Sequence, residues 1–181
     1  MKTNYFYIFG HYLWYVIRHK WFVFVEACKY GIPLRGIVHD WHKFLPDEMI
    51  PYAMYFNHPL GGRHYDKDKY LVGERLRMMF LSEHESIVDK FNVAWLKHQK
   101  RAPHHWQFWV MHEDDGDVYA MEMPKSVVKE MLCDWRGAGR AIVGKNSDTK
   151  KWYLEDARDT IMLHPNTREW IESELGIDFQ E

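Results

Sequence analysis

His39 and Asp40 are adjacent in the sequence, and an imidazole next to a carboxylate is a common beginning of a transition-metal site. On a helix, consecutive side chains diverge by about 100°, so the two could hold one cation from two directions. Lys43 follows Asp40 by three residues and would share its helical face, where it could hold an anionic substrate against the metal. Taken alone, these three residues would more often form a solvated surface turn.

Five further residues stand around this segment in an order that favours the metal site. In sequence order they are His19, His98, His104, His105 and Asp134. Together with the pair at positions 39 and 40 they give the pattern H…HD…H…HH…D. The adjacent histidines alone could equally be one exposed and one buried imidazole at a helix start, so the argument depends on the joint pattern.

Glu130 precedes Asp134 by four residues and would share its face of a helix. A carboxylate in that position could accept a hydrogen bond from the N–H of a ligating imidazole and so fix its orientation. Packing or helix capping would explain the residue equally well.

The ordered pattern resembles the HD superfamily of metal-dependent phosphohydrolases, whose one-metal core is H…HD…D. Two-metal members, such as the HD-GYP cyclic-dinucleotide phosphodiesterases, have the additional pattern H…HH between the HD pair and the final Asp. Residues 39–43, HDWHK, are similar to the HD-x-x-K form of that group, although the GYP signature is absent. Over about residues 12–163 the chain also resembles a little-characterised HD-like family of bacteria and phages, through RHKWFVFVEACKYGIPLRGIVHDWHKF, AWLKHQKRAPHHWQFW and EMLCDWRGAGRA.

This resemblance implies a helical bundle of the HD-domain type with one or two divalent transition-metal ions, drawn from Mn, Fe, Co, Ni and Zn. It implies that one ion is held by His19, His39, Asp40 and Asp134. It also implies that Asp40 bridges to a second ion held by His98, His104 and His105.

The expected activity is hydrolysis of a nucleotide or another small phosphoester by a metal-bound hydroxide, with Asp40 and Lys43 as catalytic residues. Two metals make a bridging hydroxide available near neutral pH and draw charge from the phosphoryl group. A fixed cation at Lys43 would stabilise charge on the phosphoryl oxygens.

Two other functions remain open from the sequence. A di-iron oxygenase is the first, because histidine-rich helical sites like those of myo-inositol oxygenase use oxygen at a similar metal pair. The second is a non-catalytic, metal-stabilised protein that binds a nucleotide. Retention of a ligand without turnover would indicate the second.

The elements that must position these residues are all predicted to be helices, in a single domain over residues 1–181. Both faces of the first predicted helix are apolar, which places it at the centre of the bundle. Gly137 and Gly139 are expected to close the helix that carries Asp134. The predicted helices cover residues 5–29, 34–44, 71 to about 99, 124 to about 136, 153–163 and 167–175.

The composition limits which classes of partner and which cellular location are expected. The chain has 24 basic and 26 acidic residues, which argues against a nucleic-acid-binding scaffold. Residues 3–17 are too short and too polar to span a membrane. Cys28 and Cys133 are expected to be small buried thiols. Because the sequence shows no disulfide pattern, a cytoplasmic protein is expected. The expected partner is a small phosphorylated substrate, as the resemblance implies.

Overall fold

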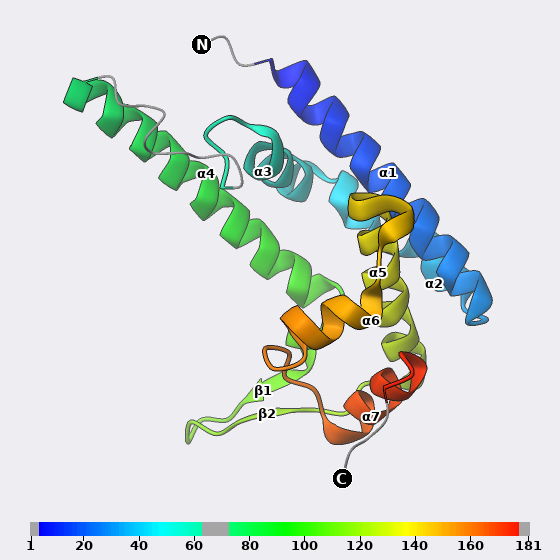
Figure 1. Ribbon diagram of the computed structural model, residues 1–181. Helices are drawn as coiled ribbons and strands as arrows, with labels where there is room; N and C mark the ends of the chain where they lie inside the picture. Colours follow the sequence, from blue (N-terminus) through cyan, green and yellow to red (C-terminus); the bar gives the residue numbers. More distant parts are fainter. Residues whose placement is uncertain (1–3, 63–72, 178–181) are drawn as a thin grey trace. The chain divides into compact units, whose positions relative to one another are not determined.

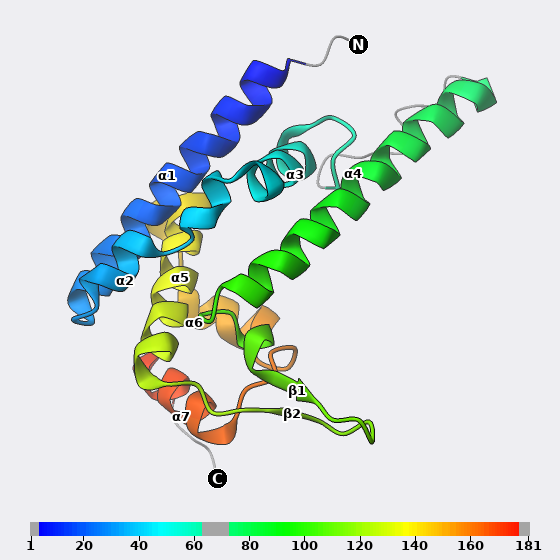
Figure 2. The same ribbon diagram turned by 180° about the vertical axis from the view of Figure 1, so that it is seen from behind.

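A computed structural model of the chain describes residues 4–62 and 73–177. Within these residues the fold is all-α, as predicted, with one short β-hairpin (Figures 1 and 2). The helices are α1 (Tyr5–Lys29), α2 (Pro33–Val38), α3 (Pro46–Asn57), α4 (Gly73–Arg101), α5 (Lys125–Val143), α6 (Thr149–Trp152) and α7 (Pro165–Glu174). Strands β1 (Val110–His112) and β2 (Val118–Ala120) pair in antiparallel register, with Met111 opposite Tyr119.

The chain divides into two compact units, each with its own hydrophobic core. Unit 1 consists of Met1–Ile17 and Trp41–His98, and unit 2 of Arg18–Asp40 and Gln99–Glu181. Each unit is therefore described by itself, and the single domain expected from the sequence stays a prediction.

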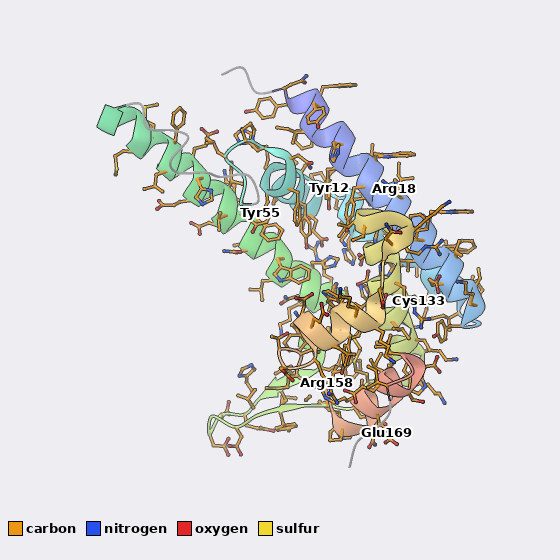
Figure 3. All side chains as sticks on the ribbon, in the orientation of Figure 1. Tyr12, Arg18, Tyr55, Cys133, Arg158 and Glu169 are labelled. Carbon is orange, nitrogen blue, oxygen red and sulfur yellow. The ribbon has the colours of Figure 1, made fainter. Side chains whose placement is uncertain are left out.

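The core of unit 1 is built by α1, α3 and α4. Ile8, Tyr12 and Val16 follow one another at steps of four on α1, which places them on one face of that helix. They share a buried cluster with Tyr52 and Ala53 of α3 and Ala94 of α4. The ring of Tyr55 stacks on Phe91 with centroids 3.8 Å apart (Figure 3), so aromatic contacts also join α3 to α4.

The core of unit 2 centres on α5. Its apolar face carries Val127, Val128, Met131 and Leu132, which pack with Tyr153, Ala157, Ile161, Ile171 and Leu175 from the C-terminal segments. A second small cluster joins Cys133 of α5 (Figure 3) to Val23 and Ala27 of α1. The helix is thus buried against two different neighbours, and its remaining face is available for polar side chains.

The structure corrects several boundaries expected from the sequence. The expected helix over residues 34–44 ends at Val38, and a separate 3-10 helix covers Trp41–Phe44. The helix carrying Asp134 continues through both glycines to Val143, and only a π-helix over Tyr153–Ala157 stands where a helix to residue 163 was expected. The hairpin was not predicted, and the expected start of α4 at residue 71 lies outside the described residues.

Two expectations about burial are also wrong. Trp14 and Trp21 on α1 are 60% and 61% exposed, so this helix buries one face rather than both. Cys28 is exposed, whereas Cys133 is buried as expected, and both thiols are free. No helix within the described residues has the length and apolar character needed to cross a membrane.

Candidate metal centre

The turn after α2 sets the positions of His39 and Asp40 in unit 2. His39 caps α2, with its N–H donating to the Arg35 carbonyl oxygen at 2.7 Å. Asp40 has a φ of 50°, in the left-handed region that few residues other than glycine adopt, with Asp among the tolerated ones. The two residues therefore leave the helix at a sharp turn, and the 100° helical divergence expected from the sequence does not apply.

Two contacts hold this turn against α1. Adding a Cβ to Gly36 would bring it within 2.8 Å of Ala27 Cβ and 2.9 Å of Phe24 Cα, so α2 lies directly on α1 at a position where only glycine fits. Lys20 Nζ donates a hydrogen bond to the His39 carbonyl oxygen. The neighbouring His19 is thereby brought to the same turn, and its side chain is buried.

A second glycine contact brings α5 to α1. Adding a Cβ to Gly137 would place it 2.5 Å from Val23 Cγ2 and 2.9 Å from Val23 N. Asp134 precedes Gly137 by about one turn, and His19 precedes Val23 by about one turn, so the two side chains meet. This packing explains why α5 continues through the glycine that was expected to end it.

The four residues predicted to hold the first ion meet in unit 2. His19 Nε2 lies 3.2 Å from Asp134 Oδ1 and 3.3 Å from His39 Nε2, which is itself 3.3 Å from the same Asp134 oxygen. Asp40 Oδ2 is 3.4 Å from His39 Nε2 and 3.8 Å from His19 Nε2. All four residues are buried.

Three of these five distances, at 3.3–3.4 Å, match the spacing of ligand atoms around one ion. Ligands at about 2.0–2.2 Å from a tetrahedral metal lie roughly 3.3–3.6 Å from one another. Ordinary N–H···O hydrogen bonds lie at about 2.7–3.2 Å, and the 3.2 Å contact of His19 with Asp134 has that length as well. The four atoms also lie mutually within 4.8 Å, so this group could hold a metal ion.

The other oxygen of Asp40 faces a different imidazole. Asp40 Oδ1 lies 3.3 Å from His104 Nε2, and His105 follows with its ring centroid 4.5 Å from that of His104. Asp40, His104 and His105 each offer a ligand atom within 4.8 Å of the others. Asp40 thus has the geometry that a bridging carboxylate would need.

Glu130 lies between two imidazoles, where a hydrogen-bond acceptor for a ligating imidazole would lie. Its Oε1 is 3.1 Å from His39 Nδ1 and 3.4 Å from His104 Nδ1. Arg35 donates to the other oxygen at 2.7 Å. An imidazole that donates from Nδ1 to a carboxylate keeps its Nε2 lone pair for a metal, and His39 Nε2 is the atom that faces Asp134.

Charge within the cluster favours a cation. Burial by itself would raise the pKa of Asp134, but hydrogen bonds from His19 and His39 outweigh it and hold that pKa well below its usual range. Burial would lower the pKa of His104, yet Asp40 beside it raises the pKa of His104 to about 10. The buried carboxylates thus favour positive charge next to them, and a divalent ion would meet the same field.

Two predicted residues belong to unit 1. Lys43 lies in the 3-10 helix Trp41–Phe44 and is half-buried. His98 lies near the end of α4 with its Nδ1 2.9 Å from Glu48 Oε2, the same oxygen that lies 2.9 Å from His42 Nδ1. The assignment of His98 to the second ion and the catalytic role of Lys43 stay predictions.

Sequence reasoning missed three residues of these clusters. His42, Glu48 and Arg35 were not predicted as site residues. Glu48 stands in the first turn of α3, where an acidic residue is ordinary because it interacts favourably with the helix dipole. No local signal distinguishes such a residue from one that contacts a histidine far away in the sequence.

The model of a family of unknown function (DUF5662) matches residues 9–177. No curated protein and no solved structure was found to match the chain. The matched region contains every candidate ligand, from His19 to Asp134.

Proposed function

The chain belongs to the DUF5662 family of unknown function, and we propose that it is a metal-dependent phosphohydrolase acting on a nucleotide or another small phosphoester. The observation that carries the proposal is the buried meeting of His19, His39, Asp40 and Asp134 with ligand-like spacing. The same four residues are those that the resemblance to the HD superfamily assigns to one ion.

The ligand atoms suit a divalent transition metal. Two imidazole nitrogens and two carboxylate oxygens form a mixed set that Mn, Fe, Co, Ni and Zn all accept, whereas calcium and magnesium prefer oxygen alone. Glu130 supports the set by holding His39 through its Nδ1. The residues present therefore fit the ion that the resemblance implies.

Asp40 would extend the site to two ions. Its two oxygens face different imidazoles, at 3.4 Å from His39 and 3.3 Å from His104. A carboxylate shared in this way keeps two ions close together, and His104 with His105 would supply ligands for the second. The strained turn at Asp40 is the backbone cost of presenting both oxygens inward.

When bound, such ions supply a nucleophile from water near neutral pH and withdraw charge from a phosphoryl group. The chain's own residues would fix the geometry: His19, His39, Asp40 and Asp134 would hold one ion, and Asp40 would also offer an oxygen to the second. Lys43 is proposed to stabilise charge on the phosphoryl oxygens, so its loss should lower the rate more than the metal content.

The test begins with metal analysis of the purified chain, followed by chelation and reloading with each of Mn²⁺, Fe²⁺, Co²⁺, Ni²⁺ and Zn²⁺. Each loaded form is then assayed for phosphate or nucleoside phosphate release from a panel of nucleotides and simple phosphoesters. We expect hydrolysis with at least one metal, and its loss in His39→Ala together with loss of the ion.

His112→Ala is the matched control, because His112 is an exposed histidine on β1 in the same unit. It should keep both metal and activity. Iron content with oxygen uptake and no phosphate release would replace the proposal by an oxygenase, and unchanged metal content in His39→Ala would refute the site itself.

A further inference from the structure

Unit 1 contains its own buried cluster of a carboxylate and two imidazoles. His42 lies in the 3-10 helix Trp41–Phe44, Glu48 in the first turn of α3 and His98 near the end of α4. The side chains of Glu48 and His98 are 0% exposed and that of His42 is 9% exposed. Three separate elements thus bring ionisable groups to one interior position.

One oxygen of Glu48 holds both rings. The Oε2 atom lies 2.9 Å from Nδ1 of His42 and 2.9 Å from Nδ1 of His98, the normal length of an N–H···O hydrogen bond. A neutral imidazole carries one N–H, so donation from Nδ1 leaves the lone pair on Nε2. Burial would raise the pKa of Glu48, but the two histidines lower it to about 2, which keeps the acceptor ionised.

Aromatic packing restricts the rotation of both rings. The His98 ring stacks on Trp95 at 5.6 Å between centroids and meets the edge of Tyr52 at 6.0 Å. The His42 and His98 rings are themselves 4.8 Å apart at 69°. The direction of each Nε2 is therefore set by the fold together with Glu48, and a ligand would meet nitrogens that are already oriented.

His58 shows that burial in this unit does not by itself produce such a group. It is also buried, but its Nδ1 accepts a hydrogen bond from Leu60 N at 3.1 Å. Its neutral ring then carries the proton on Nε2, which has no lone pair for a metal. The Glu83 Oε1 atom lies 3.9 Å from His58 Nε2.

We propose that His42 and His98 are two metal-binding imidazoles of unit 1, each directed to a divalent transition metal through Nε2, with Glu48 as their shared positioning residue. The three side chains form a group that could hold an ion, in which one atom of each, Nδ1 or Nε2 for an imidazole, lies within 4.8 Å of the others. A carboxylate behind a ligating imidazole is the usual arrangement around protein metals, and its loss weakens binding by about 10–100-fold. The resemblance assigned His98 to the second ion and nothing to His42 or Glu48, so this proposal places His98 Nε2 on an ion of unit 1 instead.

The experiment uses the full chain and measures metal binding alone, so its result does not depend on the reaction proposed above. The background is His39→Ala/Asp40→Asn/His104→Ala, which removes ligands of both ions proposed for unit 2. Bound Co²⁺ and Zn²⁺ are measured by titration and by elemental analysis. We expect this background to retain one ion, His42→Ala or His98→Ala to weaken its binding at least tenfold, and Glu48→Gln to weaken it by about 10–100-fold.

His58→Ala is the matched control and should bind the ion as the background does. A second measurement reads the imidazoles directly: nitrogen NMR of the metal-free wild-type chain should show the Nδ1–H tautomer for both His42 and His98. Glu48→Gln should shift that tautomer balance while helix content stays unchanged.

The proposal is overturned if the background retains no ion, or if the His42 and Glu48 variants bind as tightly as the background. It is also overturned if wild-type His42 and His98 carry their protons on Nε2. The tautomer measurement uses the wild-type chain, so it tests the proposal even if Glu48→Gln fails to fold.

Discussion

The two units bring histidines and carboxylates together at different distances. In unit 2, nitrogen and oxygen atoms of His19, His39, Asp40 and Asp134 stand 3.2–3.8 Å apart. In unit 1, the Glu48 oxygen is 2.9 Å from each imidazole. The first range is longer and includes the spacing of ligand atoms around a common ion, whereas the second is the usual length of a direct hydrogen bond.

The difference separates two tasks of a carboxylate near a metal. Asp134 faces Nε2 atoms, where it could act as a ligand, whereas Glu48 faces Nδ1 atoms, where it could orient its partners. Glu130 of unit 2 makes the same kind of contact as Glu48, at 3.1 Å from His39 Nδ1. Which ring nitrogen a carboxylate meets therefore predicts what its removal should do.

Removal of a ligand should have the largest effect. His39→Ala deletes one of four converging groups and leaves buried carboxylates that repel one another. We expect affinity for the unit 2 ion to fall by more than about 100-fold, beyond the range for orienting residues. Elemental analysis and competition with a chelating dye measure this loss, and His112→Ala should show none of it.

Removal of the metal comes next. Binding to the folded state alone stabilises a protein by about 2.7 kcal/mol at 100 times Kd. At roughly 2–4 °C per kcal/mol for a chain of this size, chelation should lower Tm by about 5–11 °C. Calorimetry with and without chelator gives the shift, and His39→Ala/Asp134→Asn should show a smaller one. Equal shifts in the two proteins would place the stabilising ion elsewhere.

Loss of an orienting carboxylate should be milder than loss of a ligand. Glu130→Gln keeps the shape but weakens the acceptor for His39 and the partner of Arg35. Affinity for the unit 2 ion should fall by about 10–100-fold, as for Glu48→Gln in unit 1. Isothermal titration of both variants tests the parallel, which fails if Glu130→Gln loses as much affinity as His39→Ala.

The smallest effects concern two glycines of the helical framework. Gly137→Ala would push α5 away from Val23, since the new Cβ would lie 2.5 Å from Val23 Cγ2, and should cost about 1–3 kcal/mol of stability. Gly10→Ala on α1 of unit 1 meets nothing within 4 Å and should stabilise by about 0.5–1 kcal/mol. Urea denaturation measures both, and the same sign for the two changes would contradict the packing argument.

Much of the fold could be predicted because helical periodicity is a local property. Helix α1 has the bounds expected from the spacing of its apolar residues, and α7 lies within two residues of its expected start. The end of the helix before residues 39 and 40 could not be predicted from local periodicity. It depends on Gly36 lying on α1 and on a left-handed Asp40, which are properties of the packed chain.

The sequence by itself was enough to select the candidate ligands of unit 2, because residue type and order along the chain pointed to His19, His39, Asp40, His104, His105 and Asp134. Only the tertiary structure decided what each one faces. His39 meets Glu130 across 91 residues and His98 meets Glu48 across 50. Such pairs form where packed helices meet, and the separation along the chain carries no information about which ring nitrogen will face which oxygen.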